Sequence, residues 1–299
     1  MIVYLDGKFV REEEACVSVF DHGFLYGDGI FEGIKAYNGR IFALDEHVYR
    51  FFESAQSIQL VLPLSRDEMK EAILETVRRN HLRDAYIRPV ASRGKGALGL
   101  DPKSCPKATV VIVVGADTRH PEQAGENGLT KKGLRVITSG LRRNGPDILS
   151  PRIKSTNYLN NILAKLQATA AGAQDAILLN TQGYVCELTG NNLFVVKNSR
   201  VMTPPIWAGP LDGVTRRTVL RLAAETGLAT AEEPLTLHDV YTSEECFCTA
   251  TRTEIVPIGN VDGRQIGKGE AGLITNKLAR LLHELTTREG TLIYDEETK

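Results

Sequence analysis

The stretch RIKSTNYLNNILAKLQ, residues 152–167, places one lysine, Lys154, directly before a polar STN segment and an apolar pattern. The spacing predicts a helix that ends near Gly172, because apolar residues recur three and four positions apart and glycine commonly follows a last helical turn. One side of this helix carries Leu159, Ile162, Leu163 and Leu166. Lys154 is either a surface charge or a nucleophile, and only the rest of the chain decides between these interpretations.

The composition is that of an ordinary soluble globular protein. The chain has 299 residues, 42% of them hydrophobic and 24% charged, which is enough for a sizeable core and two domains. A formal net charge of −1 gives no overall field for nucleic acid or an anionic membrane. The most hydrophobic run, ATVVIVVGA (108–116), is shorter than the roughly 20 residues of a membrane-spanning helix. Because the N-terminal residues also lack a signal-peptide pattern, we expect a cytoplasmic protein without a nucleic-acid or membrane partner.

The cysteines and histidines show no metal-site spacing. Five cysteines are an odd number without a disulfide framework, which favours reduced thiols. Cys246 and Cys248 lie two apart in a strand-like segment and therefore share a face. A metal or redox pair is one interpretation, and buried inert thiols are the favoured one. The six histidines are scattered, so we expect no bound metal.

The first part of the chain predicts a small mixed α/β domain over residues 1–118. Turn signals at DGK and NGR accompany short β-like runs, namely VYLDGKFV, VSVF and FEGIKAYNGRIF. A helix follows with Asp45 as its expected N-cap, and a second helix opens with a capping box of Ser65 and Glu68. Two strands, AYIRPVASRG (85–94) and KATVVIVVGAD (107–117), complete this part.

A polar, aperiodic segment follows, and we take residues 119–129 as an interdomain linker. Residues 130–299 then predict a larger domain. It begins with a strand and the helix of the opening stretch, and continues with short strands over 175–205 and a helix over 212–227. Two strands joined by a tight turn follow over 245–259, and a final helix covers roughly 270–287.

Three local features could carry chemistry. LDGVTRRTV (211–219) opens a helix, so the N–H groups of Gly213, Val214 and Thr215 can bind a phosphate, although every helix has such a start. Arg50 can hold a phosphate with two donors, or it lies on a solvated helix face. Glu187 either pairs with a cationic ring nitrogen or is an exposed acid in a turn.

Read together, the segments resemble the class-IV pyridoxal-phosphate aminotransferases, and most closely the branched-chain amino-acid aminotransferases. The resemblance covers nearly the whole chain and rests on several separated motifs in the same order. These motifs are DHGFLYGDGIFEGIKAY (21–37), EHVYRFFESA (46–55), AYIRP (85–89), RGKGALGLDP (93–102), KSTNYLNN (154–161), Glu187 with Asn192, Leu193 and Phe194, Thr203, and LDGVTR (211–216). The implied fold is fold type IV, with a small N-terminal α/β domain and a larger C-terminal domain that has a barrel-like core flanked by helices.

The resemblance implies pyridoxal 5'-phosphate as cofactor and Lys154 as the catalytic lysine that holds it covalently. Glu187 would pair with the protonated pyridine nitrogen and Tyr158 with the phenolic oxygen of the ring. The implied phosphate and ring ligands also include Arg50, Leu211, Gly213, Val214, Thr215 and Thr251.

The implied reaction transfers the amino group of leucine, isoleucine or valine to 2-oxoglutarate. The implied pocket needs apolar walls, supplied by Tyr26, Phe31 and Tyr86, and a cation for the distal carboxylate of glutamate, supplied by Arg88. Each aromatic residue could equally be core. Related enzymes are dimers with residues of both subunits in the pocket, so a homodimer or larger homo-oligomer is implied, with small amino acids and 2-oxo acids as partners.

Two positions depart from the family pattern. Arg252, with Thr251 beside it, replaces a small residue in a GTAAE-like turn, and it either points to solvent or binds a carboxylate in the pocket. Lys35 stands where many relatives have arginine, which replaces a planar fork by a point charge. These departures leave open an aminotransferase for D-amino acids or (R)-amines. An aminodeoxychorismate lyase and a non-catalytic cofactor-binding protein are further alternatives.

Overall fold

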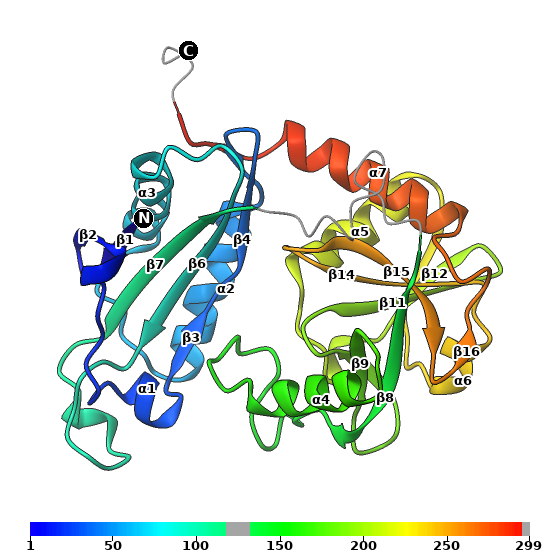
Figure 1. The fold of residues 1–299 in the computed structure, drawn as a ribbon, viewed down its shortest axis with the longest axis horizontal. Helices are drawn as coiled ribbons and strands as arrows, with labels where there is room; N and C mark the ends of the chain where they lie inside the picture. Colours follow the sequence, from blue (N-terminus) through cyan, green and yellow to red (C-terminus); the bar gives the residue numbers. More distant parts are fainter. Residues whose placement is uncertain (118–131, 295–299) are drawn as a thin grey trace. The chain divides into compact units, whose positions relative to one another are not determined.

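The computed structural model describes residues 1–117 and 132–294 (Figure 1). Of these, residues 1–117, 153–157 and 286–294 form one compact unit, and residues 132–152 and 158–285 form a second. Each unit has a sheet and a hydrophobic core of its own. The units are not continuous in sequence, since the short segment with Lys154 belongs to the first. The expected linker, residues 119–129, lies outside the described residues, and the expected domain boundaries stay a prediction.

The first unit is built on an antiparallel sheet whose central strands, β6 (Ala85–Ser92) and β7 (Thr109–Ala116), pair along their whole length. The predicted hairpins at DGK and NGR are present as β1–β2 and β4–β5. In order across the sheet, the strands are β17 (Thr291–Leu292), β5 (Arg40–Ile41), β4 (Ile34–Tyr37), β6, β7, β1 (Ile2–Leu5) and β2 (Lys8–Arg11), and β3 (Gly29–Phe31) also pairs with β6.

Two helices, α2 (Leu44–Ser57) and α3 (Arg66–Arg79), supply apolar side chains to the core of this unit. Burial alternates along β6, as expected for a strand with one face on a core. Ile87 and Ala91 are fully buried, whereas Tyr86 and Arg88 lie on the opposite face and are partly exposed. Because side chains alternate between the two faces of β6, the core residues lie on one face and two of the predicted substrate residues lie on the other.

The capping box at α3 is confirmed. The Ser65 hydroxyl accepts a hydrogen bond from Glu68 N (3.2 Å), and the Glu68 carboxylate accepts one from Ser65 N (2.7 Å). The N-cap expected at Asp45 is wrong, because α2 already begins at Leu44 after Ala43, which has a left-handed conformation (φ 51°). The short β5 ends at Ile41, and only two residues separate it from α2, so the helix begins one residue before the expected N-cap.

The strand expected at VSVF (17–20) is also wrong. These residues follow a short 3-10 helix, Glu12–Glu14, and have no strand partner in the described chain. Their backbone forms a turn instead, in which Asp21 N donates to Ser18 O and Phe20 N to the Ser18 hydroxyl. A five-residue helix, α1 (His22–Tyr26), follows.

The second unit contains a six-stranded barrel. Neighbouring strands pair in the order β10–β9–β8–β15–β14–β11, and pairing of β10 with β11 closes the ring. Its strands are β8 (Leu134–Arg142), β9 (Asp175–Leu179), β10 (Val185–Leu188), β11 (Asn192–Lys197), β14 (Glu245–Ala250) and β15 (Glu254–Val261). The sheet is extended by β12 (Arg200–Thr203), β13 (Ala229–Glu232) and β16 (Arg264–Gln265). The expected barrel-like core is thus present.

The helices of this part are α4 (Leu159–Ala170), α5 (Val214–Glu225), α6 (Leu237–Tyr241) and α7 (Leu273–Arg288). Gly172, just past the end of α4, has a left-handed conformation (φ 67°), in line with the predicted end of that helix. The face of α4 turned to strands β8 and β9 carries Ala164 and Ala168, both fully buried. The leucine and isoleucine side of the same helix is exposed instead.

Cys246 and Cys248 lie inside the barrel core, as expected for inert thiols. Burial raises the pKa of both thiols well above the usual value, so neither forms a thiolate readily.

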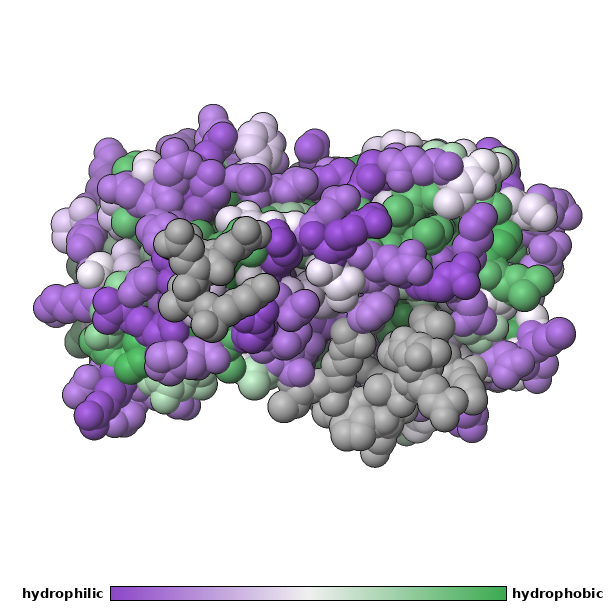
Figure 2. Space-filling view, turned by 90° about the horizontal axis from the view of Figure 1, so that it is seen from above, coloured by the Kyte–Doolittle hydropathy of each residue, from purple (hydrophilic) through white to green (hydrophobic). Residues whose placement is uncertain are grey.

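The surface seen in Figure 2 is mostly hydrophilic, with apolar side chains gathered in small groups. Within residues 1–117 and 132–294, no helix has the length and hydrophobicity needed to cross a membrane.

Candidate active site

The backbone of Lys154 is anchored on two elements of the first unit. Lys154 N donates to the hydroxyl of Ser54 on α2 (3.2 Å), and Lys154 O accepts from Phe31 N at the end of β3 (2.9 Å). The following residue, Ser155, forms an isolated β-bridge with Ile30. The side chain is partly buried, and its Nζ lies 4.7 Å from the centre of the Phe31 ring. Lys154 is therefore held in place and is not a freely mobile surface charge.

Arg88 connects two of the predicted aromatic substrate residues, Phe31 and Tyr86. The Arg88 guanidinium lies 4.6 Å from the Phe31 ring centre and 5.4 Å from that of Tyr86, and Arg88 Nη2 donates to the Tyr86 hydroxyl (2.7 Å). Arg88 Nε is buried and finds no hydrogen-bond partner in the described part of the chain. Gly33 makes room for the Tyr86 hydroxyl, because a Cβ there would come within 2.3 Å of it. The cluster thus combines aromatic walls with two cations.

Tyr26 and Lys35 have other contacts. The Tyr26 hydroxyl accepts a hydrogen bond from Gly99 N (2.9 Å), and its ring meets the edge of His22. Lys35 is fully buried, with its Nζ 2.8 Å from the Asp117 carboxylate and 4.7 Å from the centre of the Tyr37 ring. Asp117 offsets the charge of Lys35, a pairing that the sequence did not indicate.

Arg50 is buried on α2 and does not lie on a solvated face. Its Nε and Nη2 donate to the two carboxylate oxygens of Glu32, at 2.6 and 2.8 Å. His47, one turn earlier on α2, lies with its Nδ1 2.9 Å from the same carboxylate. Glu32 and His47 were not among the site residues predicted from the sequence. The available signal was the His47–Arg50 spacing, which puts both residues on one helix face.

In the second unit, Glu187 on β10 is buried and is not an exposed turn acid. Its carboxylate accepts hydrogen bonds from Arg143 Nε (2.9 Å), Asn192 Nδ2 (3.2 Å) and Leu211 N (3.1 Å). Arg143 also donates to Asn161, on α4 (3.4 Å). Arg143 was not among the predicted site residues, although it lies in the RRNGPD loop that continues β8. Three donors, from a side chain, an amide and the backbone, therefore converge on one carboxylate.

The loop before α5 is tied to the same carboxylate. Asn192 Nδ2 also donates to Leu211 O (2.9 Å), and a Cβ on Gly213 would come within 2.1 Å of the Asn192 side-chain oxygen. As predicted, a helix begins here. Gly213 is the N-cap of α5, and no side chain caps the first turn, which starts at Val214 and Thr215. Uncapped N–H groups at the start of a 12-residue helix can bind an anion.

The remaining predicted residues lie at the ends of elements of the second unit. Tyr158 is the N-cap residue of α4. Thr251 and Arg252 lie in the tight turn between β14 and β15, as the sequence predicted, with Thr251 partly buried and Arg252 exposed. The turn is held by the Thr253 hydroxyl, which donates to the Asn191 side-chain oxygen (2.9 Å).

Most of the chain, including almost all of these residues, matches one known protein family. The family described as amino-transferase class IV matches residues 29–261. The chain belongs to this family. The match includes every predicted site residue except Tyr26, which lies before it.

Relatives of this class IV aminotransferase align over almost the whole chain. A Methanocaldococcus jannaschii protein, provisionally named a branched-chain-amino-acid aminotransferase, is 49% identical over 99% of this chain and 100% of its own length. The branched-chain-amino-acid aminotransferase of Pseudomonas aeruginosa is 38% identical, covering 96% of this chain and 93% of its own.

A solved structure confirms the fold. The T.th. branched-chain amino acid aminotransferase with pyridoxamine 5'-phosphate superposes with a TM-score of 0.91 at 38% identity, covering 96% of this chain and 94% of that one. The same enzyme has been solved with N-(5'-phosphopyridoxyl)-L-glutamate and with 4-methylvaleric acid. The mixed α/β fold with a barrel core, predicted from the sequence, is therefore correct.

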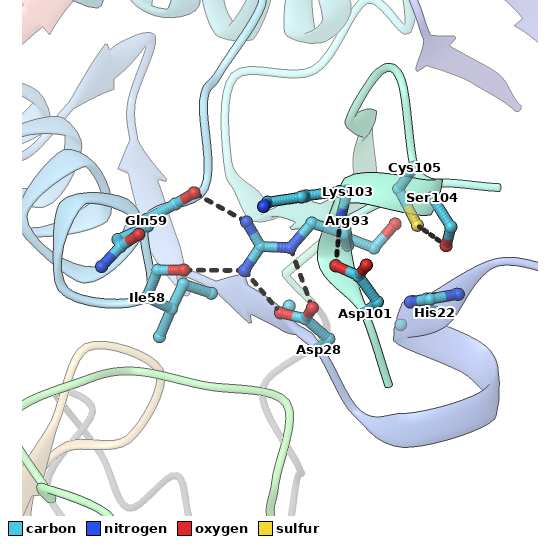
Figure 3. Close-up of polar contacts among 12 residues, drawn as sticks. His22, Asp28, Ile58, Gln59, Arg93, Asp101, Lys103, Ser104 and Cys105 are labelled. Carbon is cyan, nitrogen blue, oxygen red and sulfur yellow. Dashed lines mark hydrogen bonds and ion pairs between the residues drawn. The ribbon is translucent and has the colours of Figure 1, made fainter. Parts of the chain in front are cut away.

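This class IV aminotransferase also has a hollow of about 890 Å³ beside Arg93, away from the residues above. Arg93 donates to both carboxylate oxygens of Asp28 and to the backbone oxygens of Ile58 and Gln59 (Figure 3). These four bonds use the guanidinium to connect the loop after α2 with Asp28. The hollow contains none of the predicted site residues, so we assign Arg93 a structural role.

Proposed function

We propose that this protein transfers the amino group of leucine, isoleucine and valine to 2-oxoglutarate with pyridoxal 5'-phosphate as cofactor, giving branched 2-oxo acids and L-glutamate. The observation that carries the proposal is the cluster at Phe31, where one aromatic ring lies 4.7 Å from the Lys154 amine and 4.6 Å from the Arg88 guanidinium. A reactive amine beside an apolar wall and a carboxylate-binding cation suits a substrate that is either aliphatic or acidic. The similarity to branched-chain aminotransferases supports the same conclusion.

Each unit by itself carries residues that suit parts of the cofactor. Lys154 supplies an amine for the covalent bond, and the uncapped start of α5 at Gly213, Val214 and Thr215 supplies donors for the phosphate. Arg50 and the Thr251 hydroxyl add to the phosphate ligands, and Leu211 contributes backbone contacts. Glu187, held by three donors, pairs with the ring nitrogen, and Tyr158 binds the phenolic oxygen.

The cofactor, when bound, acts as an electron sink for the bond between Cα and its proton. Lys154 Nζ would be the base that takes the Cα proton of the amino acid and, once protonated, the acid that delivers it to the C4′ carbon of the cofactor. Glu187 would place its carboxylate opposite the ring nitrogen and stabilise a proton there, since Arg143, Asn192 and the Leu211 amide hold that carboxylate in place.

Substrate choice follows from the cluster at Phe31. Phe31 and Tyr86 form the apolar walls for leucine, isoleucine and valine, and Arg88 binds the distal carboxylate of glutamate. Tyr26, Lys35, Thr251 and Arg252 are further proposed substrate residues. Lys35 is paired with Asp117, so we propose that it helps to position the neighbouring strand residues and does not offer its charge to the substrate.

The half-reaction provides the test. Purified protein with bound cofactor is mixed with single amino acids, without an acceptor, and the visible absorption band of the lysine-bound cofactor is followed. L-Leu, L-Ile, L-Val and L-Glu are each expected to bleach the band. Bleaching by D-Ala or an (R)-amine, with no response to L-Leu, would refute the branched-chain assignment and leave the family intact.

We further propose that the protein is a cytoplasmic homodimer or larger homo-oligomer, with residues 119–129 as the linker between domains of residues 1–118 and 130–299. The exposed side of α4 supports the assembly, because four large apolar residues there are between 43% and 66% exposed. They are Leu159, Ile162, Leu163 and Leu166. Burying one such side chain contributes about 1.5 to 3 kcal/mol, so four can stabilise an interface.

The Ile162→Glu, Leu163→Glu double variant is therefore expected to shift sedimentation towards the mass of a single chain, since two charges replace the centre of the apolar face. Val61→Glu serves as the matched control, because Val61 is 85% exposed and lies on the loop after α2. Wild-type protein that sediments as a monomer would contradict the proposed assembly.

A further inference from the structure

We propose that Glu32 and His47 are positioning residues that fix the guanidinium of Arg50 and so determine how tightly the cofactor phosphate is bound. The inference rests on the proposed function, in which Arg50 binds that phosphate. Neither Glu32 nor His47 belongs to the cofactor-binding set derived from the sequence, and no part of the proposed reaction uses them.

The contact between Glu32 and Arg50 has the geometry of a fork. Arg50 Nε lies 2.6 Å from one carboxylate oxygen of Glu32, and Nη2 lies 2.8 Å from the other. Glu32 is completely buried and Arg50 nearly so, with 6% of its surface exposed. Two parallel charge-assisted hydrogen bonds in a dry environment fix both the position and the plane of a guanidinium.

His47 and the backbone of Gly33 are the further hydrogen-bond partners of the Glu32 carboxylate. His47 Nδ1 lies 2.9 Å from the oxygen that Nη2 also contacts, and Gly33 N donates to the same oxygen at 3.2 Å. Burial alone would raise the pKa of Glu32, but the charges and hydrogen bonds of Arg50 and His47 hold it well below its usual value. Burial lowers the pKa of His47 despite the Glu32 carboxylate, and the neutral and the protonated ring can each donate from Nδ1 to that carboxylate.

The cluster of Glu32, His47 and Arg50 lies close to the segment that carries Lys154. Arg50 and His47 lie one turn apart on α2, and Glu32 lies between β3 and β4, next to Phe31. The same helix carries Ser54, whose hydroxyl accepts a hydrogen bond from Lys154 N. Lys154 also lies near enough for its charge to lower the pKa of His47 further. Glu32 therefore joins the helix that carries Arg50 to the strand segment that contacts Lys154.

This arrangement links the two anchors of one cofactor molecule. In the proposed function, Lys154 holds the aldehyde end of pyridoxal 5'-phosphate and Arg50 contributes to the phosphate end. A guanidinium that loses its partner can turn to other rotamers, and displacement by about 1 Å can cost roughly 100-fold in a positioned interaction. Lys154 keeps its own backbone contacts with Ser54 and Phe31, so the effect of losing Glu32 should appear at the phosphate and not at the aldehyde.

The experiment compares two ligands that differ only by the phosphate. Dissociation constants of pyridoxal 5'-phosphate and of pyridoxal are measured for wild type, Glu32→Gln and a matched control. Glu75→Gln is the control, because it removes a carboxylate that pairs with Arg79 on the exposed side of α3. We expect Glu32→Gln to weaken pyridoxal 5'-phosphate binding by roughly 10- to 100-fold, the range found when a residue that orients a metal ligand is lost, with pyridoxal binding unchanged. The control should leave both constants unchanged.

Variants of His47 keep the test informative if Glu32→Gln does not fold, as judged by circular dichroism and the unfolding midpoint. His47→Asn places an amide donor near the position of Nδ1 and should retain the preference for the phosphorylated ligand. His47→Leu removes the donor and should reduce that preference.

Equal loss of both ligands, or an unchanged preference in Glu32→Gln and His47→Leu, overturns the positioning role. Failure of the proposed function would look different, because wild type itself would then show neither a visible cofactor band nor tighter binding of pyridoxal 5'-phosphate.

Discussion

The Lys154→Ala variant is expected to lose the visible absorption band of the lysine-bound cofactor and, with it, transamination. A positioned proton-transfer group contributes about 100- to 10,000-fold to rate, and loss of the covalent bond adds to this. The fold should persist, because the contacts that anchor position 154 to Ser54 and Phe31 are made by its backbone. The measurement is the absorption spectrum together with kcat for L-Leu and 2-oxoglutarate.

Lys197→Ala is the matched control for this variant. Lys197 is an exposed lysine whose Nζ bonds the Thr242 hydroxyl (2.9 Å), so its removal should leave the band and kcat unchanged. A Lys154→Ala protein that keeps the band, with an unfolding midpoint like that of wild type, would show that another amine holds the cofactor.

The Glu187→Gln variant is expected to lose roughly 100- to 1,000-fold in kcat, the range for removing one preorganised electrostatic partner in an active site. The charge opposite Arg143 disappears, and in either orientation the new amide N–H groups face a donor, because Arg143 Nε donates to one carboxylate oxygen and Asn192 Nδ2 and Leu211 N donate to the other. The ring nitrogen then has no anion to hold its proton. Steady-state kinetics and the pH dependence of the cofactor spectrum measure both effects.

Glu225→Gln serves as the control, since Glu225 pairs with the exposed Arg221 at the opposite end of α5 from Val214. Its kcat should stay close to that of wild type. Should Glu187→Gln keep full activity and an unchanged spectrum, Glu187 would have only a structural role beside Arg143.

Local chemistry made much of the fold predictable from the sequence. The hairpins at DGK and NGR, the capping box of Ser65 and Glu68, and the start of α5 at Val214 depend on neighbours within a few residues. Turn residues, caps and apolar periodicity encode such features directly. The same reasoning predicted the turn that carries Thr251.

Predictions failed or stayed incomplete where distant segments decide the outcome. The side of α4 that faces the barrel carries Ala164 and Ala168, because β8 and β9 pack closely against it, and the leucine side is left exposed. VSVF (17–20) has alternating character, but no described strand lies beside it to accept its hydrogen bonds. Periodicity gives the apolar face of an element, and only packing decides what that face meets.

The candidate site divides in the same way. The resemblance to the family, which rests on the order of its motifs, indicated six of the site residues. They are Lys154, Arg50, Glu187, Phe31, Tyr86 and Arg88. The partners of these groups were invisible in the sequence: Glu32 is 18 residues from Arg50, and Arg143 is 44 residues from Glu187. A buried charge must be paired, but the fold alone brings one particular partner to it, since strand pairing and helix packing fix which distant residues share a dry environment.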